Sequence, residues 1–321
     1  MVKAIGLVSG GLDSILAVKI ILEQNILVIG VSFISPFFDN SQFIKKLCKE
    51  LKIESVIIEF GKEYIGMLKN PKYGYGKNLN PCIDCHTYML KQAKILMQER
   101  DADFIFTGEV LNERPMSQNR QALVNIERES GLKGYLLRPL SAQLLEPTIA
   151  ENKGLIDRNR LGKISGRSRK PQYELAQKYG ITDIPQPASG CLLTEPNFNR
   201  RLKDALNHNE DAVAELHLLK IGRHFRTEQG AKIIVGRNES ENNELVKLTH
   251  PNDLILEPLE IPGPVVLIHN SKNHEQVTKI AAGLCARYSD KSESALVKVK
   301  VNSIIIETKS LSEELLNKMR I

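Results

Sequence analysis

The chain has 321 residues, an apolar fraction of 42% and a formal net charge of +6. At roughly 150 residues per domain this length predicts two domains, and the composition excludes a globally disordered chain. No run approaches the ~20 apolar residues that cross a bilayer, and the N-terminus lacks the pattern of a signal peptide, so we expect a cytoplasmic protein with no membrane partner. The mild positive charge agrees with an anionic partner without identifying one.

Short apolar runs alternate with amphipathic stretches in the first half of the chain. The alternation predicts strands at residues 4–8, 28–33, 55–60 and 104–107, and helices at residues 14–24, 41–51 and 86–98. Such an order of strands and helices is typical of an α/β fold with a doubly wound parallel sheet. Ligands of these sheets bind at the carboxyl ends of the strands, so we expect the chemical motifs there.

A glycine-rich segment joins the first predicted strand to the first predicted helix. Residues 9–14 read SGGLDS. Two glycines allow a tight turn that presents backbone N–H groups, the helix adds its positive dipole end, and the hydroxyls of Ser9 and Ser14 are further donors. The segment therefore predicts a pyrophosphate cradle, distinct from the Walker pattern because it has no Gly-Lys-Ser/Thr. The structural alternative is a strand–helix turn in which Asp13 and Ser14 cap the helix.

Five cysteines are present, an odd number that argues against a disulfide framework in a chain of this length. Cys48 and Cys285 fall within apolar helical patterns, so we interpret both as core residues. Cys82 and Cys85 form a CxxC before the helix at residues 86–98. Cys191 stands alone in the segment ASGCLLT.

Four interpretations compete for Cys82, Cys85 and Cys191. They are a zinc site with His86 as the fourth ligand, a thioredoxin-like redox pair, a persulfide cysteine with a resolving partner, and an iron–sulfur cluster held by three thiolates. The cluster is the interpretation we favour, because three thiolates leave one iron open for a sulfur ligand. Asp84, between the first two cysteines, is either a proton-handling residue or a helix N-cap.

The phosphate loop and the cysteine segments together resemble a known superfamily. The loop resembles the SGGxDS loop of the N-type ATP pyrophosphatases, or PP-loop proteins, which share an adenine nucleotide alpha hydrolase-like fold. Residues 80–85 (NPCIDC) and 189–194 (SGCLLT) resemble the cysteine segments of tRNA thiouridylases and 4-thiouridine synthases. Cys82 is typical of the three-cysteine, [4Fe-4S]-dependent relatives. Residues 108–118 and 138–147 also look like thiouridylase segments, so the resemblance covers about residues 1–200.

The resemblance implies roles for individual residues. ATP would be held by the phosphate loop, with Mg²⁺ assisted by Asp13, and the base would lie near the segment after the second strand. Gly108, which follows the fourth strand, would reach the same pocket, although a plain turn glycine is the alternative. The implied nucleotide-binding residues are Ser9, Gly10, Gly11, Asp13, Ser14, Ser32, Phe33 and Gly108, and the implied cluster ligands are Cys82, Cys85 and Cys191, with Zn²⁺ as the alternative metal.

Two basic sets are candidates for contacts with an RNA backbone, which would fix position and not sequence. The first lies in residues 157–170, where a solvated basic loop is the alternative, and the second alternates along a predicted β-ribbon. From these sets we predict RNA contacts for Arg158, Arg160, Arg167, Arg169, Lys170, Arg223 and Arg226.

The pattern changes after about residue 198. Short strands are predicted at 232–235, 254–256, 265–268, 295–301 and 303–307, with helices at 273–287 and 312–319. We therefore expect a PP-loop domain at residues 1–197 and a smaller α+β domain at residues 198–321. The second resembles the RNA-binding domain of the NFACT type, with Gly263-Pro264 and Arg287-Tyr288-Ser289 as markers. The ferredoxin-like extension and THUMP domain of 4-thiouridine synthases do not precede the loop.

These motifs predict an ATP-dependent tRNA sulfurtransferase that adenylates a uridine carbonyl and replaces its oxygen with sulfur. Its partners would be tRNA and a sulfur donor, either sulfide or a sulfur-carrier or desulfurase protein, and a homodimer is one option for its assembly. Two other functions stay open. The chain is alternatively an ATP-dependent amide- or thioamide-forming ligase acting on a small molecule, or a non-enzymatic RNA-binding or iron–sulfur module.

Overall fold

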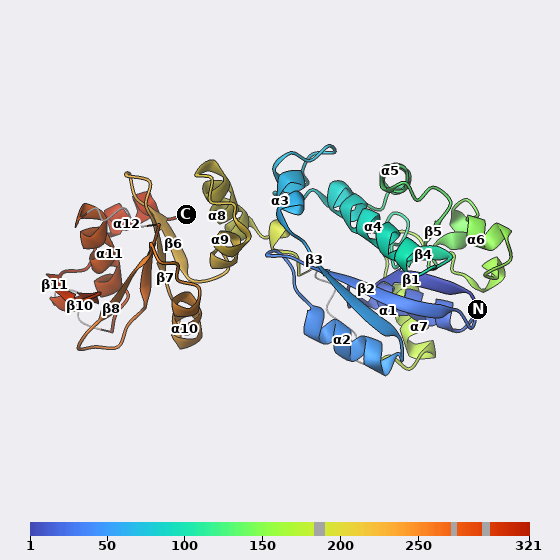
Figure 1. Ribbon diagram of the computed structural model, residues 1–321, viewed down its shortest axis with the longest axis horizontal. Coiled ribbons are helices and arrows are strands. Elements are labelled where there is room, and N and C mark those ends of the chain that lie inside the picture. The colour runs from blue at the N-terminus through green and yellow to red at the C-terminus, as the bar shows by residue number, and fades with distance from the viewer. Residues whose placement is uncertain (183–189, 271–274, 291–295) are drawn as a thin grey trace. The chain divides into compact units, whose positions relative to one another are not determined.

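The computed structural model describes residues 1–182, 190–270, 275–290 and 296–321 (Figure 1). It divides into two compact units, Met1–Thr194 (unit 1) and Glu195–Ile321 (unit 2). The predicted boundary after residue 197 therefore falls inside the first helix of unit 2, α8 (Pro196–Asn207). In the part of the chain that the structure describes, no helix is both long and apolar enough to span a bilayer.

Unit 1 is built on a five-stranded parallel sheet in the order β3-β2-β1-β4-β5. The strands are β1 (Lys3–Leu7), β2 (Leu27–Ile34), β3 (Glu54–Glu59), β4 (Phe104–Thr107) and β5 (Leu136–Leu137). The chain runs outward from β1 to β3 and then returns to the other side of β1 for β4. This reversal creates a switch point between β1 and β4, where a doubly wound sheet binds its ligand. The predicted fold class is confirmed.

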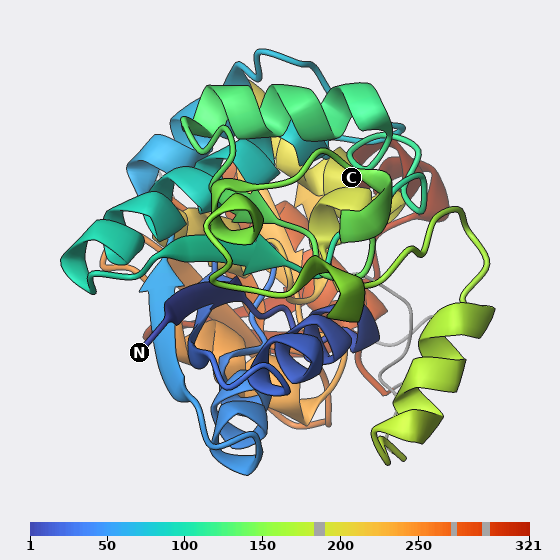
Figure 2. The ribbon, with the colours of Figure 1, turned by 90° about the vertical axis from the view of Figure 1, so that its right-hand side faces the viewer.

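Helices cover both faces of this sheet (Figures 1 and 2). One face carries α1 (Leu12–Leu22), α2 (Ser41–Glu50) and α7 (Lys170–Lys178), and the other carries α4 (Cys82–Glu99) and α5 (Arg120–Ser130). The remaining helical segments of unit 1 are α3 (Lys62–Lys69), α6 (Ile149–Asn152), and short 3-10 turns at Ala142–Leu144, Arg158–Arg160 and Leu192–Thr194. Helix α4 begins directly after Pro81, earlier than predicted, so both cysteines of the CxxC lie in its first turn.

Unit 2 contains a six-stranded antiparallel sheet in the order β11-β10-β8-β9-β7-β6. Its strands are β6 (Arg223–Arg226), β7 (Lys232–Val235), β8 (Leu254–Pro258), β9 (Val266–His269), β10 (Val297–Val301) and β11 (Ile304–Thr308). Its helices after α8 are α9 (Val213–Leu218), α10 (Glu239–Lys247), α11 (Glu275–Arg287) and α12 (Glu313–Met319). The predicted β-ribbon is the β6–β7 hairpin. Residues 273 and 295, where a helix and a strand were predicted to begin, lie outside the described residues.

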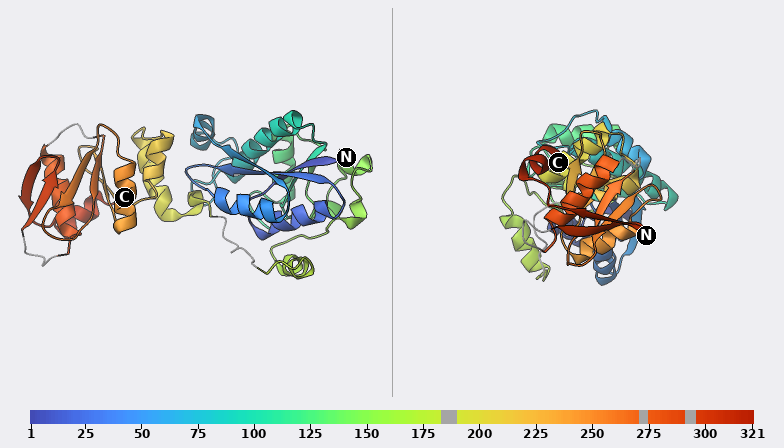
Figure 3. Two further views of the ribbon diagram at one scale, coloured as in Figure 1. Left: turned by 60° about the horizontal axis from the view of Figure 1, so that its bottom comes forward. Right: turned by 90° about the vertical axis from the view of Figure 1, so that its left-hand side faces the viewer.

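Both faces of the second sheet are covered, as Figure 3 shows for α11. Ile233 and Val235 of β7 belong to the apolar cluster beneath α11, whereas Ile234 belongs to a separate cluster with Leu245 of α10. Successive side chains of a strand point to opposite faces, so an unbroken apolar run such as that of β7 is expected where a strand is buried on both sides.

Candidate active site

The phosphate loop adopts the conformation that its glycines predict. Gly10 has a φ of +81°, a conformation that favours glycine, and a Cβ atom there would lie 2.9 Å from the ring of Phe43. Helix α1 begins at Leu12, with Gly11 at its N-cap. The Ser14 hydroxyl donates to the Gly11 carbonyl at 2.8 Å, and the Gly11 N–H donates to Ser9 Oγ at 3.4 Å. Backbone N–H groups and hydroxyls therefore gather at a helix N-terminus, the arrangement that binds phosphate.

A second segment, far away in the sequence, reaches this loop. Ser165 pairs with Leu111 in a β-bridge, and the chain then enters α7, which packs against α1. Arg169, just before α7, lies with its Nη2 atom 3.6 Å from Asp13 Oδ2. Arg169 was predicted to contact RNA, but the structure instead brings its guanidinium to the carboxylate of the phosphate loop. Burial raises the pKa of Asp13, although Arg169 and Gln172 act in the opposite direction.

The turn Thr107-Gly108-Glu109 after β4 contacts the phosphate loop on another side. A Cβ atom on Gly108 would lie 2.5 Å from the Ser14 backbone nitrogen and 2.6 Å from the Asp13 carbonyl carbon. Only a glycine fits that approach, so Gly108 packs directly against the phosphate loop.

Glu109 ties the same turn to the cysteine helix. Its carboxylate accepts from Arg138 Nε at 3.0 Å and lies 2.8 Å from Nδ1 of His86, the residue after Cys85 in α4. Burial by itself would raise the pKa of Glu109. The charges and hydrogen bonds of Arg138 and His86 outweigh burial and lower this pKa to about 2. The side chains of Glu109 and Arg138 are 6% and 4% exposed, so this is a buried ion pair. The tripeptide 107–109 thus contacts the phosphate loop through its glycine and the cysteine helix through its glutamate.

Cys191 is held beside the CxxC by hydrogen bonds on both of its flanks. The N–H of Leu192 donates to the carbonyl of Phe37, just after β2, at 2.9 Å. The Asn78 amide, in the loop before α4, donates to the Thr194 carbonyl at 2.7 Å. Ser189, at the start of the predicted SGCLLT segment, lies outside the described residues. Because both contacts are internal to unit 1, the lone cysteine belongs to the same unit as the phosphate loop.

The three thiols influence one another electrostatically. Burial is the largest cause that raises the pKa of Cys85 to about 12; the neighbouring Cys191 and Cys82 contribute to this rise, and a hydrogen bond with Tyr64 opposes it. Burial also raises the pKa of Cys191 to about 11, with a smaller contribution from Cys82. Among the residues that the structure describes, no three His, Cys, Asp or Glu side chains are grouped so that they could hold one metal ion. The thiols are therefore neighbours, but they do not form a closed single-ion site.

Two polar side chains contact the sulfur atoms directly. The Tyr64 hydroxyl lies 3.3 Å from Cys85 Sγ, and the Asn80 amide donates to Cys82 Sγ at 3.2 Å. Tyr64 is buried in an aromatic cluster with its ring stacked on Phe60, at a centroid distance of 4.6 Å. Sequence reasoning missed Tyr64, because a tyrosine in an unpredicted helix carries no local sign of a distant cysteine.

Three other predicted residues have structural surroundings that differ from the expectation. Both carboxylate oxygens of Asp84 accept backbone N–H groups at 3.0 Å, from Lys72 and Tyr73. Asp84 lies inside the first turn of α4 and anchors the preceding loop, so it is neither the N-cap nor a freely available proton acceptor. Ser32 and Phe33 lie within β2 and are buried. The ring of Phe33 packs against that of Phe60, with 5.2 Å between the two ring centroids.

The predicted RNA-contacting residues divide into exposed and internally bonded groups. Arg167 and Lys170 are exposed on unit 1. Arg158 is half-buried and pairs with Glu151 at 2.5 Å, whereas Arg160 is exposed and also donates to the Glu23 carbonyl at 2.7 Å.

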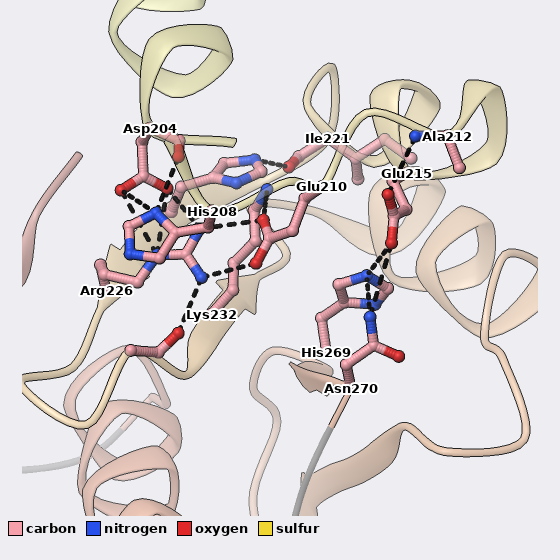
Figure 4. Close-up of polar contacts among 12 residues, drawn as sticks. Asp204, His208, Glu210, Ala212, Glu215, Ile221, Arg226, Lys232, His269 and Asn270 are labelled. Atoms are coloured by element: carbon pink, nitrogen blue, oxygen red, sulfur yellow. Dashed lines mark hydrogen bonds and ion pairs between the residues drawn. The ribbon is translucent and has the colours of Figure 1, made fainter. Parts of the chain in front are cut away.

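In unit 2, Arg223 lies 4.5 Å from the ring centroid of Tyr288. Arg226 lies between Asp204 and Glu210, and its Nη1 atom is 2.6 Å from Glu210 (Figure 4). Its guanidinium is only 10% exposed and is occupied by internal ion pairs, so we withdraw Arg226 from the RNA-contacting set.

Comparisons with known proteins agree with both halves of the resemblance. Residues 222–319 match the model of the NFACT protein RNA binding domain. The tRNA-specific 2-thiouridylase MnmA of Petrotoga mobilis is 24% identical over 334 aligned positions, which cover 93% of this chain and 86% of that protein. The tRNA-specific 2-thiouridylase MnmA 1 of Fusobacterium nucleatum is 33% identical over 106 residues, 31% of this chain. The expected relationship to PP-loop tRNA-thiolating enzymes, with an NFACT-like C-terminal part, is confirmed.

The extent of these matches varies. The chain spans 28% of the length of the Fusobacterium protein and 59% of a Listeria monocytogenes 2-thiouridylase that is 22% identical. Among solved structures, a 4-thiouridine synthetase–RNA complex with bound ATP is 18% identical to this chain, with a TM-score of 0.37. The alignment covers 56% of this chain and 51% of the synthetase chain.

Proposed function

We propose that the chain is an ATP-dependent tRNA sulfurtransferase that converts a uridine to 2-thiouridine or 4-thiouridine. The observation that carries this proposal is the presence of the phosphate loop and the three interacting thiols in one unit, joined by the turn at residues 107–109. The similarity to tRNA-specific 2-thiouridylases supports it.

The first step uses ATP to make the uracil oxygen a leaving group. The uracil carbonyl oxygen forms a bond to the α-phosphorus, and the bond to the departing pyrophosphate breaks. The loop N–H groups, with the hydroxyls of Ser9 and Ser14, stabilise the pyrophosphate with donors that are already oriented. Asp13 would hold Mg²⁺, since its buried Oδ1 atom has no hydrogen-bond partner and is an oxygen of the kind that this hard cation prefers.

The second step replaces the activated oxygen with sulfur. Sulfide forms the bond to the uracil carbon, and AMP leaves with the former carbonyl oxygen. The net change consumes uridine, ATP and hydrosulfide and yields thiouridine, AMP and pyrophosphate, without oxidation or reduction.

Cys82, Cys85 and Cys191 are the residues that would hold a cluster, since their thiols influence one another electrostatically within unit 1. The Asn80 amide donates to Cys82 Sγ, and the Tyr64 hydroxyl would donate to a Cys85 thiolate; hydrogen bonds of this type tune cluster sulfurs. A [4Fe-4S] cluster bound by these three residues would supply an open iron that holds sulfide. Free thiols with pKa values near 11 and 12 would be almost wholly protonated at neutral pH, which disfavours an unassisted persulfide pair.

RNA binding would be shared between the two units. The match to an RNA-binding domain lies in unit 2, and the exposed Arg167 and Lys170 offer phosphate contacts on unit 1. The substrate class is then tRNA, in a cytoplasmic setting, with a separate sulfur donor.

Anaerobic purification followed by an absorption spectrum and an iron count tests the cluster. We expect a brown protein that loses its colour and iron on Cys82→Ala. The matched control is Cys48→Ala, since Cys48 is a buried core thiol outside the trio, and this variant should keep its iron. A colourless protein that contains zinc would contradict the cluster.

ATP–pyrophosphate exchange separates the proposed function from its alternatives. Exchange that depends on tRNA supports the sulfurtransferase. Exchange stimulated by a small metabolite and indifferent to tRNA would instead identify a small-molecule ligase, and no pyrophosphate release with any RNA would identify a binding module.

A further inference from the structure

Four polar side chains form a cluster beside the phosphate loop, here called the flank cluster: Asp13, Glu113, Arg169 and Gln172. Glu113 follows β4 in the chain, and Arg169 and Gln172 come from the start of α7. The pairing of Ser165 with Leu111 brings these two segments together. The Gln172 amide donates to Glu113 Oε2 at 3.1 Å, and Arg169 lies 3.6 Å from Asp13.

Three atoms of the flank cluster are buried and have no hydrogen-bond partner. They are Asp13 Oδ1, Arg169 Nε and Gln172 Oε1. Gln172 is fully buried, at 0% exposure. A buried polar atom without a partner costs roughly 1–3 kcal/mol, so three in one cluster indicate a bound group that satisfies them.

The chemistry of these atoms restricts what that group is. Two of the three are oxygens, one from a carboxylate and one from an amide, and the third is a guanidinium N–H donor. The Glu113 carboxylate, which accepts from the Gln172 amide at 3.1 Å, adds a further oxygen to the cluster, and Arg114 and Arg169 are the positive charges near it. A divalent cation would bind both unsatisfied oxygens, while a phosphate oxygen would accept from the Arg169 guanidinium.

We propose that Glu113 and Gln172 complete, together with Asp13, a divalent-cation site on the flank of the phosphate loop, which loads with the triphosphate of ATP. This site rests on the ATP step of the proposed function. Mg²⁺ is commonly bound through one or two carboxylates plus substrate phosphates, and that leaves positions for water and for the amide oxygen. Arg169 is the counterion of Asp13 before loading and a phosphate donor afterwards.

Binding of Mn²⁺, followed by electron paramagnetic resonance of the free ion, tests the site without any turnover. The probe is Mn²⁺ with an α,β-methylene analogue of ATP, because the bond that the proposed reaction breaks is absent from it. Gln172→Met keeps the size of the side chain and removes the oxygen, and Glu113→Gln removes a charge. Each variant should weaken Mn²⁺ binding by roughly 10- to 100-fold or more. A loss of that size is typical when a residue that only orients a metal ligand is removed, and a direct ligand should matter at least as much. Gln177→Met, at an exposed position of the same helix, is the matched control and should bind as the wild type does.

A third variant separates ligation from a structural role. Gln172→Glu also loses the amide donor to Glu113, yet it supplies a ligand oxygen with a charge. It should bind Mn²⁺ at least as tightly as the wild type, and its thermal unfolding without metal should occur at a lower temperature because three carboxylates then share the cluster. If Gln172→Glu binds as weakly as Gln172→Met, the amide acts only as a structural donor, and the proposal is wrong.

The remaining outcomes distinguish the site from the function. Wild-type Mn²⁺ affinity in Gln172→Met overturns the cation site and leaves the sulfurtransferase intact. The predicted losses in a protein that never thiolates tRNA support the site and refute the function. A wild-type chain that binds neither the nucleotide analogue nor Mn²⁺ removes both the site and the ATP step.

Discussion

Arg169 in unit 1 and Arg226 in unit 2 both lie in basic stretches of the sequence, but they have different surroundings. Arg226 makes ion pairs with Asp204 and Glu210, and the adjacent Lys232 also pairs with Glu210, at 2.9 Å (Figure 4). Arg169 has one carboxylate at 3.6 Å and a buried Nε atom with no partner. Arg226 therefore stabilises the fold of unit 2, whereas the unused Nε donor of Arg169 is a group that the proposed phosphate contact would satisfy. Variants of the two arginines test this distinction.

The largest effect is expected at Arg226. Arg226→Met removes the positive charge that pairs with Asp204 and Glu210, whose side chains are only 15% and 13% exposed. Breaking a buried ion pair in this way should destabilise unit 2 by about 3–5 kcal/mol. Urea unfolding followed by hydrogen exchange in β6 and β7 measures the loss. Arg200→Met on the exposed face of α8 is the control and should change stability by no more than about 0.5 kcal/mol. Weakened ATP binding in Arg226→Met, with unit 2 still folded, would break the comparison.

Glu109→Gln should destabilise unit 1 by about 3 kcal/mol at neutral pH. A fall of the pKa from the ordinary 4.5 to about 2 in the folded state corresponds to that energy. Because the folded-state pKa is depressed, this stabilisation is fully present above pH 4.5 and is lost as the pH falls toward 2. The difference in unfolding free energy between wild type and variant should therefore shrink over that range. A constant difference from pH 7 to pH 2 would contradict the ion pair as its cause.

Sequence patterns predicted what is local and missed what depends on distant contacts. The order of β1 to β4 and the two cysteine segments followed from apolar runs and short motifs. Helices α3 and α5 were not predicted, and neither was the contact between Arg169 and Asp13, because only the bridge between Ser165 and Leu111 brings that arginine to the phosphate loop. The residues next to Tyr64 and Gln172 in the sequence do not indicate the distant groups that these two side chains contact.

Arg169→Met tests the other arginine of the comparison. It should cost less stability than Arg226→Met, because Arg169 lies 3.6 Å from one carboxylate and, among the residues that the structure describes, makes no network of ion pairs. It should weaken ATP binding by roughly 10- to 100-fold, since a hydrogen bond to a charged group contributes about 1.5–3 kcal/mol. Isothermal titration with the α,β-methylene analogue measures this change. The exposed Arg167→Met is the matched control from the same segment and should bind the nucleotide normally. Equal nucleotide affinity in both variants would return Arg169 to the RNA-contacting set.

The smallest effect concerns the exposed basic residues. Arg167→Ala and Lys170→Ala should each weaken tRNA binding by a similar factor for every tRNA, and each should reduce the slope of log affinity against log salt by about 1. Filter binding of tRNA at salt concentrations between about 50 and 200 mM measures this slope. An unaltered slope in both variants would move the RNA contacts away from this part of unit 1.

We propose above all that Cys191, remote in sequence from the CxxC, joins Cys82 and Cys85 in holding the group that supplies sulfide to a base activated at the phosphate loop. Mass spectrometry of nucleosides from tRNA incubated anaerobically with ATP, sulfide and the Cys191→Ser protein tests it most directly, with pyrophosphate measured in the same reaction. We predict that the variant releases pyrophosphate but forms no thiouridine, while the wild type does both. Thiouridine at the wild-type level in Cys191→Ser would contradict the account.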